Sequence, residues 1–533
     1  MTMQLQPQDM KPVTEPLSPA SIASLIDAHA AAQPGDTFFI APAADGPDGR
    51  SVPHKVTWSE LRDAVRRFSA RLDALGIVPG EPVSVMMANG WCSVLAILGA
   101  LYGGRVVAPV NLVAGDTQIG YMLDHSGTQL VLVSDEEEAR LRAIAAKVDR
   151  DIRIVVCTVD NGPVWPDGIA VDEGAVTGLA DCEADGLLMY TSGTTGNPKG
   201  ALLTQRAIVA GGLNAIAAHH LTGADRTLLV LPLYHINGFC VSLMSTIASG
   251  ASIVVPHRFS ARRFWDQLLD NDCAWFSAVP TQIQYLLKGA EDGGPPPRER
   301  MDGVRFARSA SAPLSPDIQR RFEDLTGLAI VETMGLTECA AQILSNPMPP
   351  GLRKFGSPGI AFGNQVTVID EQFHPVPAGT PGEIAVKGNN VFRLYLKNEA
   401  ATAEAFTPDG WFRTGDLGFM DEDGYVFVTG RIKELIIKGG ENIAPREIDE
   451  ALLSHPDVVE AAAFARSCEN YGQIVEAAVL LRDGAACGEA DLIGLCREQV
   501  GAFKAPDRVH ILDDLPRGPS GKVQRLKLAE RFA

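Results

Sequence analysis

A ten-residue segment rich in glycine and hydroxyl side chains is the most informative stretch for chemistry. Residues 191–200 read TSGTTGNPKG and directly follow the apolar run LLMY at 187–190, which is typical of a strand. Glycines let the backbone present N–H groups to an anion, hydroxyls donate further hydrogen bonds, and Lys199 adds positive charge. We therefore expect a polyphosphate-binding loop, with a surface loop of small residues as the alternative that composition leaves open. Gly200 follows Lys199, so this is not a Walker A loop.

The glycine-rich segment resembles a motif of a known protein family. Residues 190–200 (YTSGTTGNPKG) resemble the signature loop of the adenylate-forming superfamily, which includes acyl-CoA synthetases, peptide-synthetase adenylation domains and firefly luciferase. Further motifs of that family follow in the family's order. They are 232–236 (PLYHI), 309–314 (SASAPL), 334–338 (MGLTE), 411–416 (WFRTGD), 430–436 (GRIKELI), 439–443 (GGENI), 445–448 (PREI) and 519–522 (PSGK). Because the resemblance covers nearly the whole chain, the protein is identified as a member of the acyl-CoA synthetase branch.

The resemblance implies a two-step ligase. Members of this family convert a carboxylic acid and Mg-ATP into an acyl-adenylate with release of pyrophosphate, and a thiol then displaces AMP. We expect ATP, Mg²⁺ and coenzyme A as the cofactors and a small carboxylic acid as the substrate. By resemblance, the β- and γ-phosphates contact Thr191, Ser192, Gly193, Thr194, Thr195, Gly196 and Lys199. The AMP moiety is expected at Ser311, Ala312, Pro313, Met334, Gly335, Thr337, Asp416 and Arg431, with Asp416 accepting the ribose hydroxyls and Thr337 contacting the α-phosphate.

The resemblance also assigns catalytic and mobile residues. Glu338 matches the family's Mg²⁺ ligand, and a lone carboxylate suits an ion that keeps waters and takes other ligands from phosphates. Lys522 matches the lysine that bridges the acyl carboxylate and the α-phosphate during adenylation. Thr337 and His235 complete the expected catalytic set. Lys433 lies at the family's hinge, on which the C-terminal domain rotates between half-reactions. The expected coenzyme A contacts are Lys438, Gly439, Gly440 and Lys504.

Two positions depart from the family pattern. Ser311 stands where glycine is usual, and Met334 stands where an aromatic residue usually stacks on adenine. A methionine can still lie over a ring through a sulfur–aromatic contact. We therefore expect ATP binding to persist, with weaker affinity or base selectivity.

The expected acyl pocket is more polar than a fatty-acid tunnel. Its predicted residues are His235, Asn237, Gly238, Phe239, Val279, Ser309 and Ala310, with His257, Arg258, Arg353 and Lys354 as further basic candidates. Residues 346–358 look like branches of the family that handle small polar acids. We predict a short polar or dianionic acid of the oxalate, malonate or sulfoacetate type. The alternatives are a medium-chain fatty or aryl acid, a carrier protein as the acceptor, and a catalytically idle nucleotide-binding sensor, against which intact Lys522, Glu338 and Asp416 argue.

Strand and helix patterns alternate along the first two-thirds of the chain. Apolar runs at 83–87, 106–110, 130–133 and 152–156 predict strands, and 92–102 predicts a helix. Thr57 and Glu60 form a capping-box pattern before a helical apolar stripe. Further strands are expected near Leu228, Ile253 and Trp275, and helices at 260–269 and 317–325. This alternation predicts an α/β fold with two helix-flanked, mostly parallel sheets.

The last third has a different pattern. Helices are expected to disappear between 366 and 427, which indicates a small β-rich subdomain at about 360–430. A helix at 445–454 and strands at 458–465 and 474–481 predict a mobile α+β domain. We therefore divide the chain into an N-terminal AMP-binding domain, 1–430, and a C-terminal domain, 431–533.

Composition excludes several partner classes. The 533 residues contain 46 Lys+Arg and 65 Asp+Glu, for a net charge of −19. Non-specific binding to nucleic acid or anionic membrane requires the opposite charge, so neither partner is expected. The nine cysteines form no C-x-x-C pair, and the N-terminus has no apolar signal region. We expect a cytoplasmic protein with reduced thiols, as a monomer or homodimer.

Overall fold

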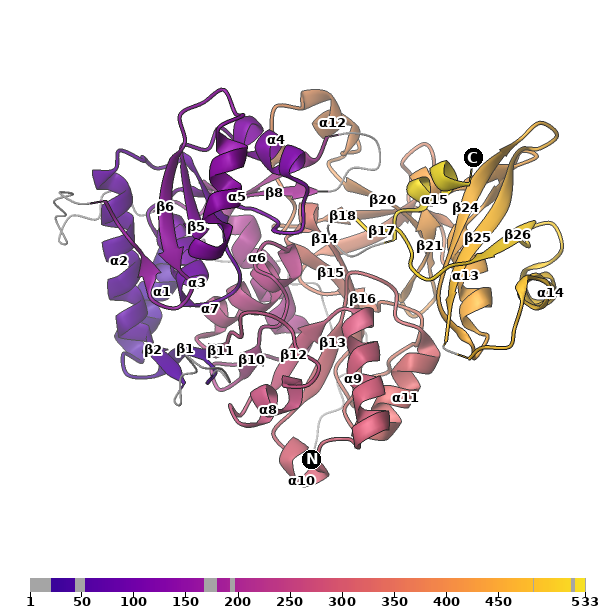
Figure 1. Ribbon diagram of the computed structural model, residues 1–533, viewed down its shortest axis with the longest axis horizontal. Helices are drawn as coiled ribbons and strands as arrows, with labels where there is room; N and C mark the ends of the chain where they lie inside the picture. Colours follow the sequence, from indigo (N-terminus) through magenta and orange to yellow (C-terminus); the bar gives the residue numbers. More distant parts are fainter. Residues whose placement is uncertain are drawn as a thin grey trace. The chain divides into compact units, whose positions relative to one another are not determined.

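The computed structural model describes residues 21–43, 53–166, 180–191, 197–482, 484–518 and 523–532. It has two compact units: Met1–Val366 with Val386–Phe406, and Thr367–Ala385 with Thr407–Ala533. The elements follow one another along the chain as in Figure 1. None of the helices in the described residues is both long and apolar enough to cross a membrane.

One sheet of the first unit has the strand order β19-β9-β8-β4-β3-β5-β6-β7. Its parallel centre is β3 (Pro82–Met86), β4 (Val106–Pro109), β5 (Leu130–Ser134) and β6 (Arg153–Thr158), as the apolar runs predict. The edges are β7 (Gly162–Pro163), β8 (Asp185–Thr191), β9 (Lys199–Thr204) and β19 (Leu394–Tyr395). Helices α4 (Asp116–Ser126) and α5 (Asp135–Ala145) share a core cluster with β3 and β5.

The helices before this sheet follow local sequence signals. The predicted capping box of α2 (Trp58–Ala74) is confirmed, because Thr57 N donates to Glu60 Oε2 at 2.7 Å and Glu60 N donates to Thr57 Oγ1 at 3.3 Å. Helix α3 (Trp91–Tyr102) is buried at every residue, and it packs against α1 (Ile22–Ala32), α2, β3 and β4. A short buried apolar helix is thus part of the core.

The other sheet of this unit has the order β16-β15-β14-β13-β12-β10-β11-β1-β2. Its strands are β1 (Thr37–Ala41), β2 (His54–Thr57), β10 (Arg226–Leu228), β11 (Ser252–Val254), β12 (Trp275–Ala278), β13 (Phe306–Ser309), β14 (Ile330–Leu336), β15 (Ala341–Ser345) and β16 (Ile360–Ala361). Helices α8 (Phe264–Leu269), α9 (Pro280–Gly293) and α11 (Pro316–Thr326) cover one face, with α9 and α11 side by side (Figure 1). The short α10 (Arg298–Met301) precedes β13.

Alternate residues of β12 and β13 face in opposite directions. Phe276 and Ala307 belong to the cluster under α8, α9 and α11. Ser277 and Arg308 face the opposite way, toward the π-helical segment η2 (Asn237–Met244). That side also holds α6 (Gln205–His219) and α7 (Ser245–Ser249), which pack against η2. The alternation therefore separates an apolar face from a polar, buried one.

The second unit begins with an antiparallel sheet. Its strands are β17 (Gln365–Ile369), β18 (Gly382–Lys387), β20 (Phe412–Met420) and β21 (Val426–Arg431). This confirms the predicted β-rich subdomain. The expected absence of helices from 366–427 is wrong at α12 (Glu399–Glu404), which lies in the first unit. The Asn398 side chain accepts a hydrogen bond from Ala401 N at 3.0 Å and begins this helix, so one local cap decides it.

The rest of the second unit is α+β, as predicted. It contains β22 (Ile436–Lys438), β23 (Glu441–Ile443), α13 (Pro445–Leu453), β24 (Val458–Cys468), β25 (Gly472–Leu481), α14 (Glu489–Val500), β26 (Arg508–Ile511) and α15 (Arg525–Arg531). Helices α13 and α14 contribute to one apolar cluster with β24 and β25. The domain boundary at 431 and the mobility of the C-terminal domain stay predictions.

Candidate active site

The two ends of the glycine-rich loop lie side by side. Thr191 ends β8, Lys199 begins β9, and the two residues pair in the antiparallel register. Thr191 Oγ1 donates to the Lys199 carbonyl at 3.4 Å. The predicted phosphate contacts Ser192, Gly193, Thr194, Thr195 and Gly196 lie outside the described residues. The hairpin thus fixes the base of the loop and the position of its lysine.

Tyr395 connects this lysine to the expected metal ligand. Lys199 Nζ lies 4.8 Å from the centroid of the Tyr395 ring. The Tyr395 hydroxyl donates to Glu338 Oε1 at 2.7 Å. Burial, with the nearby Glu338 carboxylate, raises the pKa of Tyr395, so the phenol stays protonated and remains a donor. The sequence analysis missed Tyr395, which belongs to none of the recognised motifs.

Strand pairing places Tyr395 there. Strand β19 is antiparallel to β9, with Tyr395 opposite Ala201. On the other side, Phe392 N donates to the Glu338 carbonyl at 2.7 Å. The segment from Phe392 to Tyr395 therefore bridges the lysine-bearing hairpin and the segment that carries Glu338.

Backbone geometry holds Thr337 and Glu338 in a tight turn. Both lie in the 3-10 turn η3 (Thr337–Cys339), which is followed by Ala340 and Ala341 at φ 47° and 82°. A Cβ on Gly335 would lie 1.8 Å from the Ala341 carbonyl oxygen. Only glycine allows this approach of β14 and β15. Met334, just before it, is half-buried on β14.

The backbone of the loop after β13 explains why glycine is usual at position 311 in the family. Ser311, Ala312 and Pro313 are exposed, and Ser311 has φ 74°. Glycine adopts this left-handed region without a steric penalty, whereas serine does not. The family's usual glycine at this position therefore matches the backbone that the structure shows.

Asn237, a predicted acyl-pocket residue, belongs to a buried polar group. Its Oδ1 accepts hydrogen bonds from Ser277 Oγ at 3.1 Å and from Arg308 Nη1 at 2.9 Å. Arg308 also donates to Ser277 Oγ at 2.9 Å and to Gln342 Oε1 at 3.2 Å. The sequence analysis did not single out Arg308. A charged residue within a short strand of a buried parallel sheet is the signal that could have found it.

The other predicted acyl residues lie around the same elements. His235 N donates to the Pro232 carbonyl at 3.1 Å and precedes η2. A Cβ on Gly238 would lie 2.6 Å from that same carbonyl oxygen, so η2 packs closely on this turn. Val279 directly follows β12 and is half-buried, and Ser309 ends β13 and is fully buried.

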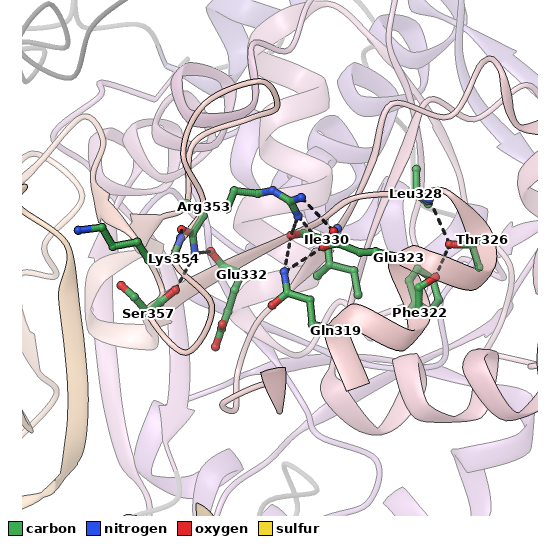
Figure 2. A network of polar contacts seen from close by, with 11 residues as sticks. Gln319, Phe322, Glu323, Thr326, Leu328, Ile330, Glu332, Arg353, Lys354 and Ser357 are labelled. Carbon is green, nitrogen blue, oxygen red and sulfur yellow. Dashed lines mark hydrogen bonds and ion pairs between the residues drawn. The ribbon is translucent and has the colours of Figure 1, made fainter. Parts of the chain in front are cut away.

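Two of the basic residues proposed from the sequence, Arg353 and His257, are engaged elsewhere. Figure 2 shows the Arg353 side chain turned toward Glu323, whose two oxygens accept hydrogen bonds at 2.5 and 2.9 Å. Lys354 points away from that pair in the same view. His257 lies 3.0 Å from Asp160. The Arg353 guanidinium and the His257 ring therefore both have carboxylate partners within the first unit.

Two of the expected nucleotide contacts meet in the second unit. Asp416 on β20 and Arg431 on β21 pair across the antiparallel ladder. Arg431 Nε donates to Asp416 Oδ1 at 2.7 Å, with the aspartate side chain 5% exposed and the arginine side chain 44% exposed. The guanidinium thus fixes the orientation of the carboxylate that the resemblance assigns to the ribose.

The expected coenzyme A contacts also lie in this unit. Gly439 and Gly440 form the turn between β22 and β23, at φ 60° and 88°. Lys438 Nζ lies 3.3 Å from Asp507 Oδ2, and Lys504 Nζ lies 2.6 Å from Glu447 Oε2. Both lysines are therefore paired with carboxylates in this structure.

Of the expected hinge residue and the expected catalytic lysine, the structure describes only the first. Lys433 is exposed in the short turn η4 (Ile432–Glu434). Lys522 lies outside the described residues. Arg517 and Val523, on either side of it in the chain, form an antiparallel bridge.

Comparison with known proteins gives the family. Residues 26–396 match the family described as AMP-binding enzyme, and residues 447–522 match the AMP-binding enzyme C-terminal domain. The chain belongs to the AMP-binding enzyme family. A sulfoacetate–CoA ligase from Cupriavidus necator is 43% identical over 97% of this chain and 98% of that protein. An oxalate–CoA ligase from Arabidopsis thaliana is 36% identical over 91% and 96%, respectively.

A solved structure agrees with this family assignment. ATP-bound MatB from Rhodopseudomonas palustris has a TM-score of 0.84 and 30% identity, covering 96% of this chain and 99% of that one. The predicted superfamily and its acyl-CoA synthetase branch are confirmed. The AMP-binding enzyme is an ATP-dependent, AMP-forming acid–CoA ligase, with ATP, coenzyme A and a carboxylic acid as its substrates.

Proposed function

We propose that this ligase activates a short acid with a second anionic group, of the oxalate, malonate or sulfoacetate type. The observation that carries the proposal is the buried polar group around Asn237, where a tunnel for a fatty acid would be apolar. The relatives from Cupriavidus necator and Arabidopsis thaliana are ligases for sulfoacetate and oxalate, which supports the same class. A medium-chain or aryl acid is the competing substrate class.

The adenylation step requires groups that neutralise the negative charge of the phosphates. In the proposed site Lys199 and the glycine-rich loop bind the β- and γ-phosphates. Thr337 contacts the α-phosphate. The acid's carboxylate oxygen then forms a bond to the α-phosphorus as the bond to pyrophosphate breaks. His235 lies in the segment that leads into the acyl pocket and is proposed to contact the reacting carboxylate.

Glu338 is the residue proposed to hold Mg²⁺. Its Oε1 accepts the Tyr395 hydrogen bond, and its Oε2 makes no hydrogen bond within the described part of the chain. One oxygen is thus oriented by the protein and the other is available to a cation, which fits an ion bound through one carboxylate. Mg²⁺ bound there would neutralise phosphate charge during adenylation. The role of Glu338 in this proposal is to hold the cation near Lys199 and Thr337.

The second step replaces the nucleotide by a thioester. The sulfur of coenzyme A attacks the acyl carbonyl and AMP leaves. We propose that Lys522 acts in the first step only, and that a rotation at Lys433 then brings the Gly439–Gly440 turn, with Lys438 and Lys504, to coenzyme A. Asp416 and Arg431 hold the ribose. We also propose that the enzyme works in the cytoplasm as a monomer or homodimer, and its nine free cysteines fit a reducing compartment.

Release of AMP from ATP and coenzyme A, measured with one acid at a time, tests this function. We expect rapid release with sulfoacetate, oxalate or malonate, and loss of that release when EDTA removes divalent cations. Octanoate and benzoate should support little release. Rapid release with octanoate or benzoate and none with the three short dianionic acids would overturn the proposal.

A further inference from the structure

Arg308 is a buried guanidinium whose partners in the described part of the chain are all neutral. Its side chain is 1% exposed. Its three hydrogen-bond partners, Gln342, Asn237 and Ser277, carry no charge. Within the described ranges it forms no ion pair, and its Nη2 makes no hydrogen bond. One positive charge and two N–H donors are therefore left unmatched inside the first unit.

Arg105 shows what a buried arginine looks like when its charge is matched. It is 0% exposed, and its Nη2 pairs with the Asp73 carboxylate. Burying a charge without such a partner is costly. Arg308 remains charged at neutral pH, because burial lowers its pKa only to about 9. His219 nearby adds no second positive charge, since burial and Arg308 lower the pKa of its imidazole and keep it neutral.

Asn237 gives an independent sign of a missing ligand. Its side chain is 5% exposed, and its Oδ1 already accepts from Ser277 and Arg308. This fixes the amide orientation and leaves Nδ2 as a buried donor without a partner in the part of the chain that is described. Asn237 and Arg308 thus offer unused donors from two adjacent side chains. An anion with several acceptor oxygens would satisfy both.

The position of Arg308 limits the length of the acid. It lies three residues before Ser311 along the chain, which corresponds to roughly 10 Å of extended strand. Trp275 lies two residues before Ser277 and Phe306 two residues before Arg308, so both rings project from the same face of the sheet. The two rings are stacked, with their centroids 5.5 Å apart. A long alkyl chain would have to displace the arginine or these packed rings, whereas a two- or three-carbon acid would not.

We propose that Arg308 and Asn237 bind the second anionic group of the acid, a carboxylate or sulfonate, and so select short dianionic acids. This inference rests on the proposed function and names the residues that set its substrate class. Arg308 Nη2 and Asn237 Nδ2 donate to that group while the first carboxylate reacts with ATP.

The test compares kcat/KM for a dianionic and a monoanionic acid of similar size. The probes are sulfoacetate, oxalate and malonate, each against butyrate, in wild type, Arg308→Met and Asn237→Asp. Methionine keeps an unbranched side chain that is shorter and carries no charge, and aspartate places a carboxylate beside Arg308. Each variant should lower kcat/KM for the preferred dianion by about 100-fold, mainly through KM. The ratio of dianion to butyrate kcat/KM should therefore fall, and Arg308→Lys should restore part of that ratio.

Arg105→Met is the matched control. It also removes a buried arginine, but one with a carboxylate partner. We expect a lower melting temperature and an unchanged ratio of dianion to butyrate kcat/KM. If Arg308→Met and Asn237→Asp also keep the wild-type ratio, Arg308 does not bind the second anionic group. The three dianions distinguish a sulfonate from a carboxylate as the preferred group.

The design separates two failures. If wild type turns over none of the dianionic acids, the proposed function fails and this inference fails with it. If wild type prefers a dianion but the variants keep that preference, only the role of Arg308 and Asn237 is overturned. A variant too unstable to assay is replaced by Arg308→Gln, judged by the same ratio.

Discussion

Tyr395 Oη donates to Glu338 Oε1 at 2.7 Å, while the same ring lies 4.8 Å from Lys199 Nζ. One side chain thus holds the lysine proposed for the phosphates and the carboxylate proposed for the cation. Its hydroxyl and its ring act on different partners, so substitutions can separate the two contacts.

Tyr395→Phe should remove the hydrogen bond and keep the ring under Lys199. A hydrogen bond to a charged group is worth about 1.5–3 kcal/mol, so adenylation should slow by roughly 10- to 100-fold. The Mg²⁺ concentration for half-maximal rate should rise, with little change in the KM for ATP. Tyr395→Leu should also raise that KM, because the cation–π contact is lost. Acid-dependent exchange of pyrophosphate into ATP across a Mg²⁺ series measures both effects, and a Phe variant with wild-type Mg²⁺ dependence would contradict the role given to the hydroxyl.

Gly335→Ala should disturb the turn that carries Glu338. The new Cβ would lie 1.8 Å from the Ala341 carbonyl oxygen, so the backbone must move. Such overpacking costs about 1–3 kcal/mol or more, and adenylation should fall together with the melting temperature. Gly289→Ala is the control, since nothing lies within 4 Å of its added Cβ in α9. That variant should melt at or slightly above the wild-type temperature. Equal melting and equal activity for both variants would show that the close approach is not needed.

His219 should make the protein less stable in mild acid. Burial, reinforced by the charge of Arg308, lowers the pKa of His219 well below its usual value. The unfolded chain takes up a proton below about pH 6.5 and the folded chain does not, so the free energy of unfolding falls as pH falls. The slope from this one group approaches about 1.4 kcal/mol per pH unit.

Urea denaturation at pH 7.5, 6.5 and 5.5 measures this effect. His219→Gln does not titrate and keeps a side chain that can hydrogen-bond to Gln342. It should start less stable at pH 7.5 but lose less stability on acidification than wild type. Parallel pH profiles for the two proteins would mean that His219 accepts a proton while folded.

The two half-reactions should respond to different residues. Lys522→Ala should stop acid-dependent adenylate formation and largely spare coenzyme A transfer from a supplied acyl-adenylate. Lys433→Pro fixes φ at the proposed hinge and should block mainly thioester formation. Single-turnover assays of each half-reaction measure this, with a circular-dichroism melt to confirm folding. Equal impairment of both half-reactions in a folded Lys522→Ala variant would contradict the two-state scheme.

Local signals in the sequence predicted much of the fold. The capping box of Thr57 and Glu60 depends on residues three apart, and the strands of the first unit follow from short apolar runs. The pairing of Asp416 with Arg431 was not predicted as a contact, although both residues lie in recognised motifs. Helix α12 was missed because a single Asn398 cap begins a helix too short for any periodicity.

Contacts between distant segments could not be found in this way. Tyr395 meets Glu338 only because β19 pairs with β9, which is an outcome of the folded sheet. Arg353 was chosen from its sequence neighbourhood, but Glu323 on α11 holds its charge. Arg308 was overlooked because its burial, and the lack of a carboxylate partner among the described residues, are properties of the three-dimensional surroundings. The sequence shows a charged residue within a short strand, but only the structure shows that this charge is buried beside neutral partners.

A competition experiment tests the central claim most directly. Equal concentrations of sulfoacetate, oxalate, malonate, butyrate, octanoate and benzoate share one reaction with ATP, Mg²⁺ and coenzyme A, and mass spectrometry quantifies each thioester. Because competing substrates are consumed in proportion to kcat/KM, the product ratios give the selectivity itself. We predict that one of the three dianionic acids supplies most of the thioester formed at early times. A product mixture dominated by butyryl-, octanoyl- or benzoyl-CoA would contradict the account.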